Sequence, residues 1–103
     1  MAKFVLAYRG GGMADTPEEQ HKAMEAWMGW FGTLGAAVVD AGNPFGASCT
    51  VGPDGSSRDG NQAGLTGYSI IEAVSVTDAA DKAKGCPVLA SGGSVEVYEA
   101  MPM

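Results

Sequence analysis

The sequence is poor in basic residues, and this scarcity limits the partners that it can have. Six lysines and arginines stand against twelve aspartates and glutamates, which gives the 103-residue chain a formal net charge of −6. The six basic residues are scattered along the chain and form no cluster. A negative surface repels phosphate backbones and anionic lipid headgroups. We therefore expect neither nucleic acid nor a membrane as a partner.

Long apolar runs are also missing. The first apolar run, KFVLAYR at residues 3–9, gives way to three glycines too early for the apolar region of a secretory signal. No run approaches the roughly 18 residues that a membrane-spanning helix needs. The two cysteines, Cys49 and Cys86, allow one disulfide at most, whereas small secreted domains usually carry more. These features predict a cytoplasmic protein with reduced thiols.

The residues that hold metals are equally scarce. His21 is the only histidine, and neither C-x-x-C nor H-x-x-x-H spacing occurs in the chain. A nucleophilic cysteine needs a base beside it, and nothing in the sequence places His21 beside Cys49 or Cys86. We therefore expect no metal and no cofactor, and we do not assign either cysteine a catalytic role.

Apolar periodicity and turn residues predict a single α+β domain over residues 1–103. The predicted order is β-α-β-β-α-β, with a glycine-rich hairpin or loop at about 43–66, and this order is that of a ferredoxin-like protomer. The predicted elements are a strand at 3–9, a helix at 17–34, a strand at 36–42, a strand at 67–75, a short helix ending before Gly85 and a strand at 94–101.

Both predicted helices have clear start signals. Thr16 is placed to cap the first helix, with Pro17 at its first position and Glu19 completing a capping box, and Gly35 marks its end. Ser75 and Asp78 form a second capping box. At 100° per residue, one stripe of the first helix is apolar and should pack on the sheet. Its members are Met24, Trp27, Met28, Phe31 and Leu34.

The predicted strands are apolar on both faces. Adjacent residues in each strand, which point to opposite faces, are both apolar: Phe4 and Val5, Val38 and Val39, Ile70 and Ile71, Val97 and Tyr98. Two helices can cover only one face of such a sheet. An apolar face without a cover is a binding surface, and the simplest cover is a second copy of the chain. The sequence therefore predicts a homodimer.

The stretch RGGGMADTPEEQH, residues 9–21, has the glycines and following helix of an anion-binding loop. It matches neither G-x-x-x-x-G-K-[ST] nor G-x-G-x-x-G. Asp15, Glu18 and Glu19 already place carboxylates at the helix start. We interpret the stretch as a flexible connection between strand and helix.

His21 ends that stretch and lies near the edge of the apolar stripe, which predicts a half-buried side chain. Glu25, four residues on, can hydrogen-bond the imidazole. Gly29 and Gly32 continue this edge, and each costs about 1 kcal/mol in a helix relative to alanine. We hypothesise that they allow a neighbouring element or a ligand to approach the helix. The alternative is an edge or exposed histidine without a function.

The ordered patterns over nearly the whole chain resemble a known family. HKAMEAWMGWFGTLGAAVVDAGNPFG is similar to the N-terminal half of the YCII-related and DGPF-type small proteins, and GYSIIEAVSVTDAADKAKGCP with SGGSVEVYEAM is similar to their C-terminal half. This resemblance implies a dimeric α+β barrel. It also implies an acid–base pair of a helix histidine, similar to His21, and an aspartate before a proline. Here Cys86 precedes Pro87, so Asp40 or Glu25 would have to replace that carboxylate.

Two functions follow, and both stay open at this point. In the first, a pocket between helix and sheet binds a small organic ligand, and His21 serves as general acid and base for a lyase or isomerase-like reaction. Tyr8 or Arg9 would contact the substrate, Glu25 would orient His21, and Trp27 would provide an aromatic wall, unless it only packs the core. In the second, the dimer is a non-catalytic interaction module that binds through its acidic surface and the tip at 52–64.

Overall fold

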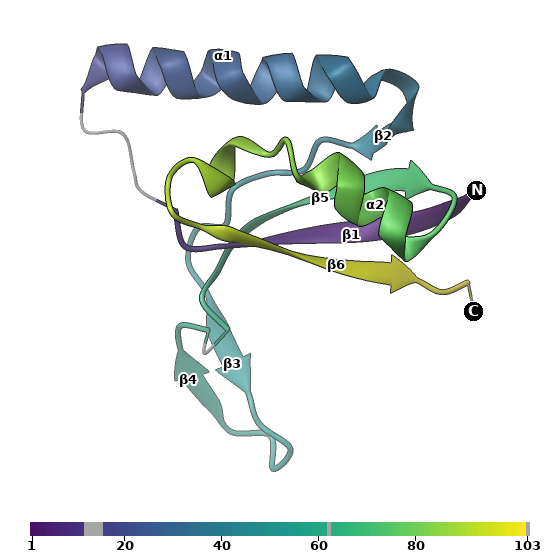
Figure 1. The fold of residues 1–103 in the computed structure, drawn as a ribbon. Helices are drawn as coiled ribbons and strands as arrows, with labels where there is room; N and C mark the ends of the chain where they lie inside the picture. Colours follow the sequence, from purple (N-terminus) through teal and green to yellow (C-terminus); the bar gives the residue numbers. More distant parts are fainter. Residues whose placement is uncertain (12–15, 62, 103) are drawn as a thin grey trace.

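A four-stranded antiparallel sheet with two helices on one of its faces forms the body of the computed structural model (Figure 1). The structure describes residues 1–11, 16–61 and 63–102. The strand order β2-β5-β1-β6 is compatible with a ferredoxin-like fold. The elements of the body are β1 (Ala2–Arg9), α1 (Pro17–Leu34), β2 (Val38–Asp40), β5 (Leu65–Ala73), α2 (Val76–Ala83) and β6 (Ser94–Ala100).

β1 lies at the centre of the sheet and carries much of the core. It pairs with β5 on one side and with β6 on the other. Because side chains alternate along a strand, Phe4, Leu6 and Tyr8 all face the helices, and all three are buried. Ile71 and Val97, on the neighbouring strands, pack against the same cluster.

α1 begins and ends at the predicted residues. The Thr16 hydroxyl accepts a hydrogen bond from the Glu19 backbone N–H at 3.1 Å. Gly35 ends the helix with a φ of +56°, a conformation that glycine adopts without strain. The second predicted start is confirmed too, because the Asp78 N–H donates to the Ser75 hydroxyl at 3.1 Å.

The predicted apolar stripe of α1 is only partly correct. Met24 and Met28 are 63% and 69% exposed, whereas Trp30 is only 6% exposed. The helix is rotated towards α2, because the Trp30 indole N–H donates to the Lys82 carbonyl at 3.1 Å. Burying the large indole ring of Trp30 stabilises the packing more than burying the two flexible methionines would. The buried face of α1 is therefore centred nearer to Trp30 than the periodicity predicts.

The second strand is shorter than predicted. Residues Gly35–Ala37 form a 3₁₀ turn, and β2 itself is limited to Val38–Asp40. The chain then runs so close beside β5 that a Cβ on Gly42 would lie 1.7 Å from the Tyr68 carbonyl oxygen. Regular pairing with β5 is therefore interrupted at Ala41 and Gly42, where the sequence predicts a continued strand, and it resumes only as an isolated bridge between Pro44 and Gly67.

Residues between β2 and β5 form a separate hairpin of β3 (Cys49–Val51) and β4 (Ser57–Asp59). In Figure 1 it projects below the sheet, on the side away from both helices. The Gly52 N–H donates to the Ser56 carbonyl at 2.7 Å and closes the turn. The predicted hairpin is confirmed, and the mobility of its tip stays a prediction.

The face of the sheet opposite the helices has no covering element among the described residues (Figure 1). The strand register places Val5 between Ile70 and Tyr98 on this face, with Ala7 beside them. Tyr98 is 55% exposed. We call this the open face.

Two further predictions concern the loop before α1 and membrane-spanning helices. The loop that connects β1 to α1 falls largely on residues 12–15, which lie outside the described residues. Among the helices of the described segments, none has both the length and the apolar character that crossing a membrane requires.

Candidate functional site

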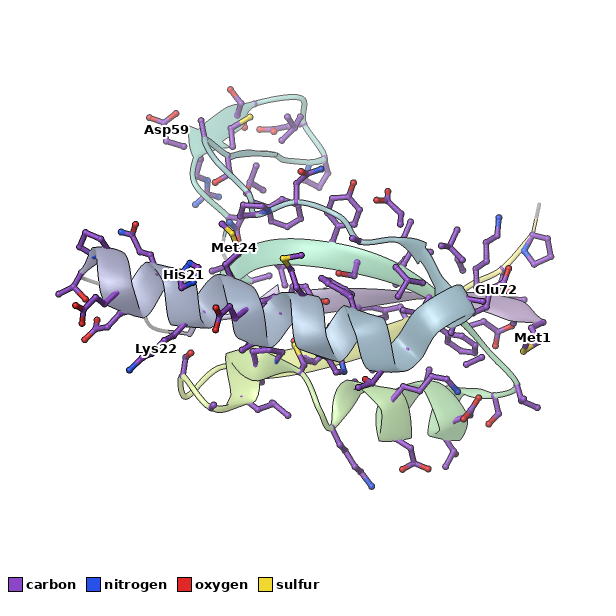
Figure 2. The ribbon with its side chains drawn as sticks, turned by 90° about the horizontal axis from the view of Figure 1, so that it is seen from above. Met1, His21, Lys22, Met24, Asp59 and Glu72 are labelled. Carbon is purple, nitrogen blue, oxygen red and sulfur yellow. The ribbon has the colours of Figure 1, made fainter. Side chains whose placement is uncertain are left out.

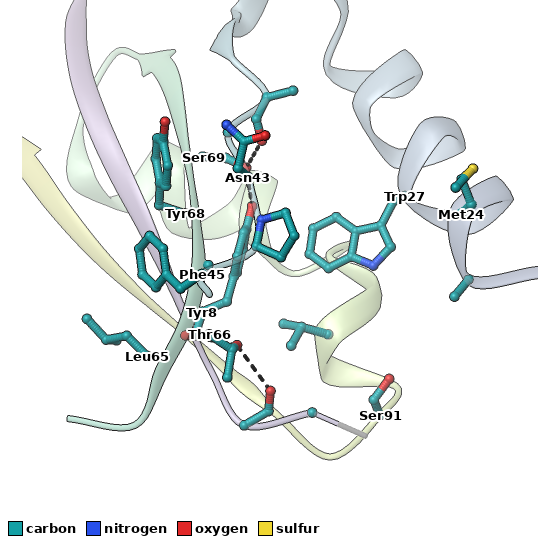
Figure 3. A pocket seen from close by; sticks show the side chains of 18 of the residues that line it. Tyr8, Met24, Trp27, Asn43, Phe45, Leu65, Thr66, Tyr68, Ser69 and Ser91 are labelled. Carbon is teal, nitrogen blue, oxygen red and sulfur yellow. Dashed lines mark hydrogen bonds between the residues drawn. The ribbon is translucent and has the colours of Figure 1, made fainter. Parts of the chain in front are cut away.

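A cavity of about 710 Å³ lies between α1 and the sheet. Its walls come from the middle of α1, the end of β1, residues 41–46 and the start of β5 (Figure 3). These segments meet because β1 and β5 are paired while residues 41–46 run beside β5, so segments far apart in the sequence share one site.

Aromatic rings form much of the cavity wall. Trp27 packs edge-on against Tyr8, with ring centroids 5.0 Å apart, and its ring centroid lies 5.9 Å from that of Phe31. Across the cavity, Phe45 stacks on Tyr68 at 5.8 Å. Each ring is thereby held by another ring, so the wall presents a fixed apolar surface.

The floor of the cavity holds a short chain of hydrogen bonds. The Tyr8 hydroxyl donates to the Ser69 hydroxyl at 2.6 Å, and Ser69 donates to the Ala41 carbonyl at 2.6 Å. Burial raises the pKa of Tyr8 far above its usual range, although the hydrogen bond between Tyr8 and Ser69 opposes this rise. The phenol is therefore neutral and already bonded, which suits a structural group better than an acid or base.

Cys86 is buried in the core close to Tyr8. Burial raises the pKa of its thiol from 9.0 to about 11, and this outweighs the hydrogen bonds that favour the thiolate. The thiol is protonated at neutral pH and is a poor nucleophile. Cys49 lies in the exposed hairpin, away from the cavity.

His21 and Glu25 are in contact on α1, with the imidazole Nε2 2.8 Å from the carboxylate. The predicted contact is confirmed, but the predicted half burial is wrong, because the two side chains are 73% and 67% exposed. Trp30 lies nine positions after His21. At 100° per residue, this spacing places the two side chains on opposite sides of the helix. Figure 2, viewed from above α1, shows His21 on the near face of the helix, and neither His21 nor Glu25 lines the cavity.

Arg9 also lies outside the cavity. It follows Tyr8 on β1 and so points to the opposite face of the sheet, where its guanidinium lies 2.9 Å from the Glu96 carboxylate. Asp40, the other proposed partner of His21, instead accepts a hydrogen bond from the Gly42 N–H at 2.8 Å. Of the predicted site residues, the structure brings Tyr8 and Trp27 together and leaves Arg9, His21 and Glu25 elsewhere.

Residues 41–46 and Ser69 also belong to the site, although the sequence did not predict them there. The sequence does contain one indication for Ser69, which lies between Tyr68 and Ile70 in an apolar strand. A serine that is buried there needs hydrogen-bond partners. Residues 41–46 have no regular pairing pattern and reach the site through a turn, which no periodicity predicts.

Gly29 and Gly32 face open space. A Cβ on either glycine would meet nothing within 4 Å in the described parts of the chain. The hypothesis that a neighbouring element of the same chain approaches them is therefore wrong, and approach by a ligand or a second copy stays a prediction. Within residues 1–11, 16–61 and 63–102, no three histidines, cysteines or acidic residues gather into a group that could hold a metal ion.

No protein-family model, curated protein or solved structure matches this chain. The resemblance to YCII-related proteins therefore stays an expectation drawn from short sequence patterns. The arguments for function come from the cavity and the two faces of the sheet.

Proposed function

We propose that this chain is a homodimeric small-molecule-binding protein of the YCII-related type, with a ligand site in each protomer between α1 and the sheet. One observation carries the proposal: an aromatic-walled cavity of about 710 Å³ lies at that position. Ligand sites in proteins typically have volumes of about 300–1,000 Å³ and apolar walls with a few polar groups. The cavity meets both criteria.

Binding is better supported than acid–base catalysis. The Tyr8 phenol on the cavity floor and the Cys86 thiol in the core are neutral at physiological pH, and burial raises the pKa of each group further above it. His21, the general acid and base that the sequence predicts, projects from the outer side of α1. Its role as a general acid and base stays a prediction that would require a substrate bound outside the cavity.

The open face supports the dimer. Val5, Ile70 and Tyr98 lie together on it, and in one protomer they face water. A second copy related by a two-fold axis would cover these residues with the same residues of its own sheet. The result would be the dimeric α+β barrel that the family resemblance implies.

The binding function can be tested by filling the cavity. Ala23 lines the cavity from α1, whereas Ala26, on the same helix, does not. Both side chains are exposed, so phenylalanine at either position should be compatible with folding. We expect a library of small fragments, observed by ligand NMR, to yield binders that bind wild type and Ala26→Phe but lose about tenfold or more in affinity for Ala23→Phe.

The same screen distinguishes the ligand-binding function from the alternative function, a non-catalytic interaction module. The β3–β4 hairpin projects from the body, and Val51 on it is 64% exposed, which favours a non-catalytic interaction module. If no fragment distinguishes Ala23→Phe from Ala26→Phe, the ligand site is wrong and the interaction module becomes the better account.

A further inference from the structure

The described residues that line the cavity include no charged side chain. Aspartate, glutamate, lysine, arginine and histidine are all absent from this described lining. Its polar groups are hydroxyls, amides and an indole. A ligand in this cavity would therefore meet no opposite charge from the described residues that line it.

Several of these polar groups are already occupied. Ser69 is bonded to Tyr8 and to the Ala41 carbonyl, and the Thr66 hydroxyl lies 3.3 Å from the carbonyl oxygens of Tyr8 and Gly10. In the part of the chain that the structure describes, the indole N–H of Trp27 has no acceptor. Trp27 lines the cavity, so this N–H is the group that we expect to donate a hydrogen bond to a ligand there.

The Asp40 carboxylate, the net charge of the chain and the aromatic rings do not favour a charged ligand either. The Asp40 carboxylate accepts hydrogen bonds from the Gly42 N–H at 2.8 Å and from the Tyr68 hydroxyl at 3.5 Å, so its oxygens are engaged. The formal net charge of −6 further disfavours anions. Trp27 packs edge-on against Tyr8, and Phe45 stacks on Tyr68, so these rings do not form the cage of open faces that binds cations.

Moving a carboxylate or an ammonium out of water costs free energy unless an opposite charge or several hydrogen bonds replace the lost water. An uncharged aromatic molecule loses little hydration free energy when it enters the cavity, and it gains contact with the aromatic rings. We propose that the cavity selects uncharged aromatic ligands that carry a hydrogen-bond acceptor, and that it discriminates against their carboxylate and ammonium analogues. This inference rests on the proposed ligand site and narrows its ligand class.

Three probes of one shape test the selection: 1-naphthol, 1-naphthoate and 1-naphthylmethylammonium, each titrated at pH 7. The readout is the NMR signal of the Trp27 indole N–H. The Trp30 indole N–H is the internal control, because it already donates to the Lys82 carbonyl at 3.1 Å. We expect 1-naphthol to shift the Trp27 signal and leave that of Trp30 unchanged, with each charged probe binding at least about tenfold more weakly.

A pair of lysine variants tests whether missing charge causes the selection. Met24 lines the cavity and Met28 does not, and both are exposed residues of α1. We expect Met24→Lys to raise the affinity for 1-naphthoate several-fold, because it places a cation at the cavity wall. The control Met28→Lys should leave the affinities of all three probes unchanged.

The outcomes separate the two claims. If 1-naphthoate or the ammonium probe binds as tightly as 1-naphthol with the same Trp27 shift, the selection for uncharged ligands is refuted while the ligand site stands. If none of the three probes shifts the Trp27 signal, or if Ala23→Phe binds them as wild type does, the ligand site itself is refuted.

Discussion

At the scale of single residues, burial decides which side chains can act chemically. Tyr8 and Trp27 were predictable as site residues because an apolar strand and an apolar helix stripe carry them. His21 was misplaced because the periodicity of α1 does not reveal that Trp30 docks against α2 and rotates the helix. A small rotation of the helix is enough to expose a histidine that lies at the edge of its buried face.

Burial of Cys86 predicts a loss of stability at alkaline pH. Its pKa is raised from 9.0 to about 11 in the folded state. Between these values the unfolded chain releases a proton that the folded protein keeps, so the free energy of unfolding falls as the pH rises. Below about pH 9 this contribution is fully present, and the loss should reach on the order of 2 kcal/mol.

Urea denaturation between pH 8 and pH 11 measures this effect. We expect Cys86→Ala to reduce the fall in unfolding free energy above pH 9. The exposed thiol serves as control, because Cys49→Ala should keep the wild-type slope. Equal slopes for wild type and Cys86→Ala would show that the thiol does not contribute.

At the scale of elements, the sequence predicts those bounds that depend on local chemistry and misses those that depend on distant contacts. The bounds of α1 follow from local chemistry, since Thr16, Pro17 and Gly35 act on neighbouring backbone atoms. The early end of β2 could not be predicted in this way, because it depends on how closely the chain approaches β5 at Gly42. Contacts between distant segments leave no periodic signal.

Two glycines with different surroundings test this description of the elements. We expect Gly32→Ala to stabilise the protein by about 1 kcal/mol, because the site is open and helical. Gly42→Ala should destabilise it by about 2–4 kcal/mol, because its φ is +77° and the new Cβ would clash with the Tyr68 carbonyl.

Denaturant unfolding of both glycine variants gives these values. A loss of stability in Gly32→Ala would mean that something approaches α1 closely after all, such as a ligand or a second copy. An unchanged stability of Gly42→Ala would contradict the close approach of the chain to β5 at this glycine.

At the scale of the whole molecule, the two faces of the sheet depend on each other. Gly67 and Ser69 of β5 face the cavity, whereas Ile70, the next residue along the strand, points to the alternate side, towards the open face. The strand that forms the cavity floor therefore also carries the apolar surface that we propose a second copy covers. The sequence predicted this two-sided pattern correctly because strand alternation is a local property. It could not predict the cavity, which needs α1, β5 and residues 41–46 to meet.

The central claim is that this sheet is completed by a second copy of the chain, and sedimentation equilibrium at micromolar concentration tests it most directly. Val5 lies on the open face, whereas Val74 is 78% exposed in the turn after β5. We expect wild type and Val74→Glu to sediment as dimers, and Val5→Glu and Tyr98→Glu to sediment as monomers, because a buried carboxylate opposes association. A folded wild-type monomer under these conditions would contradict the account.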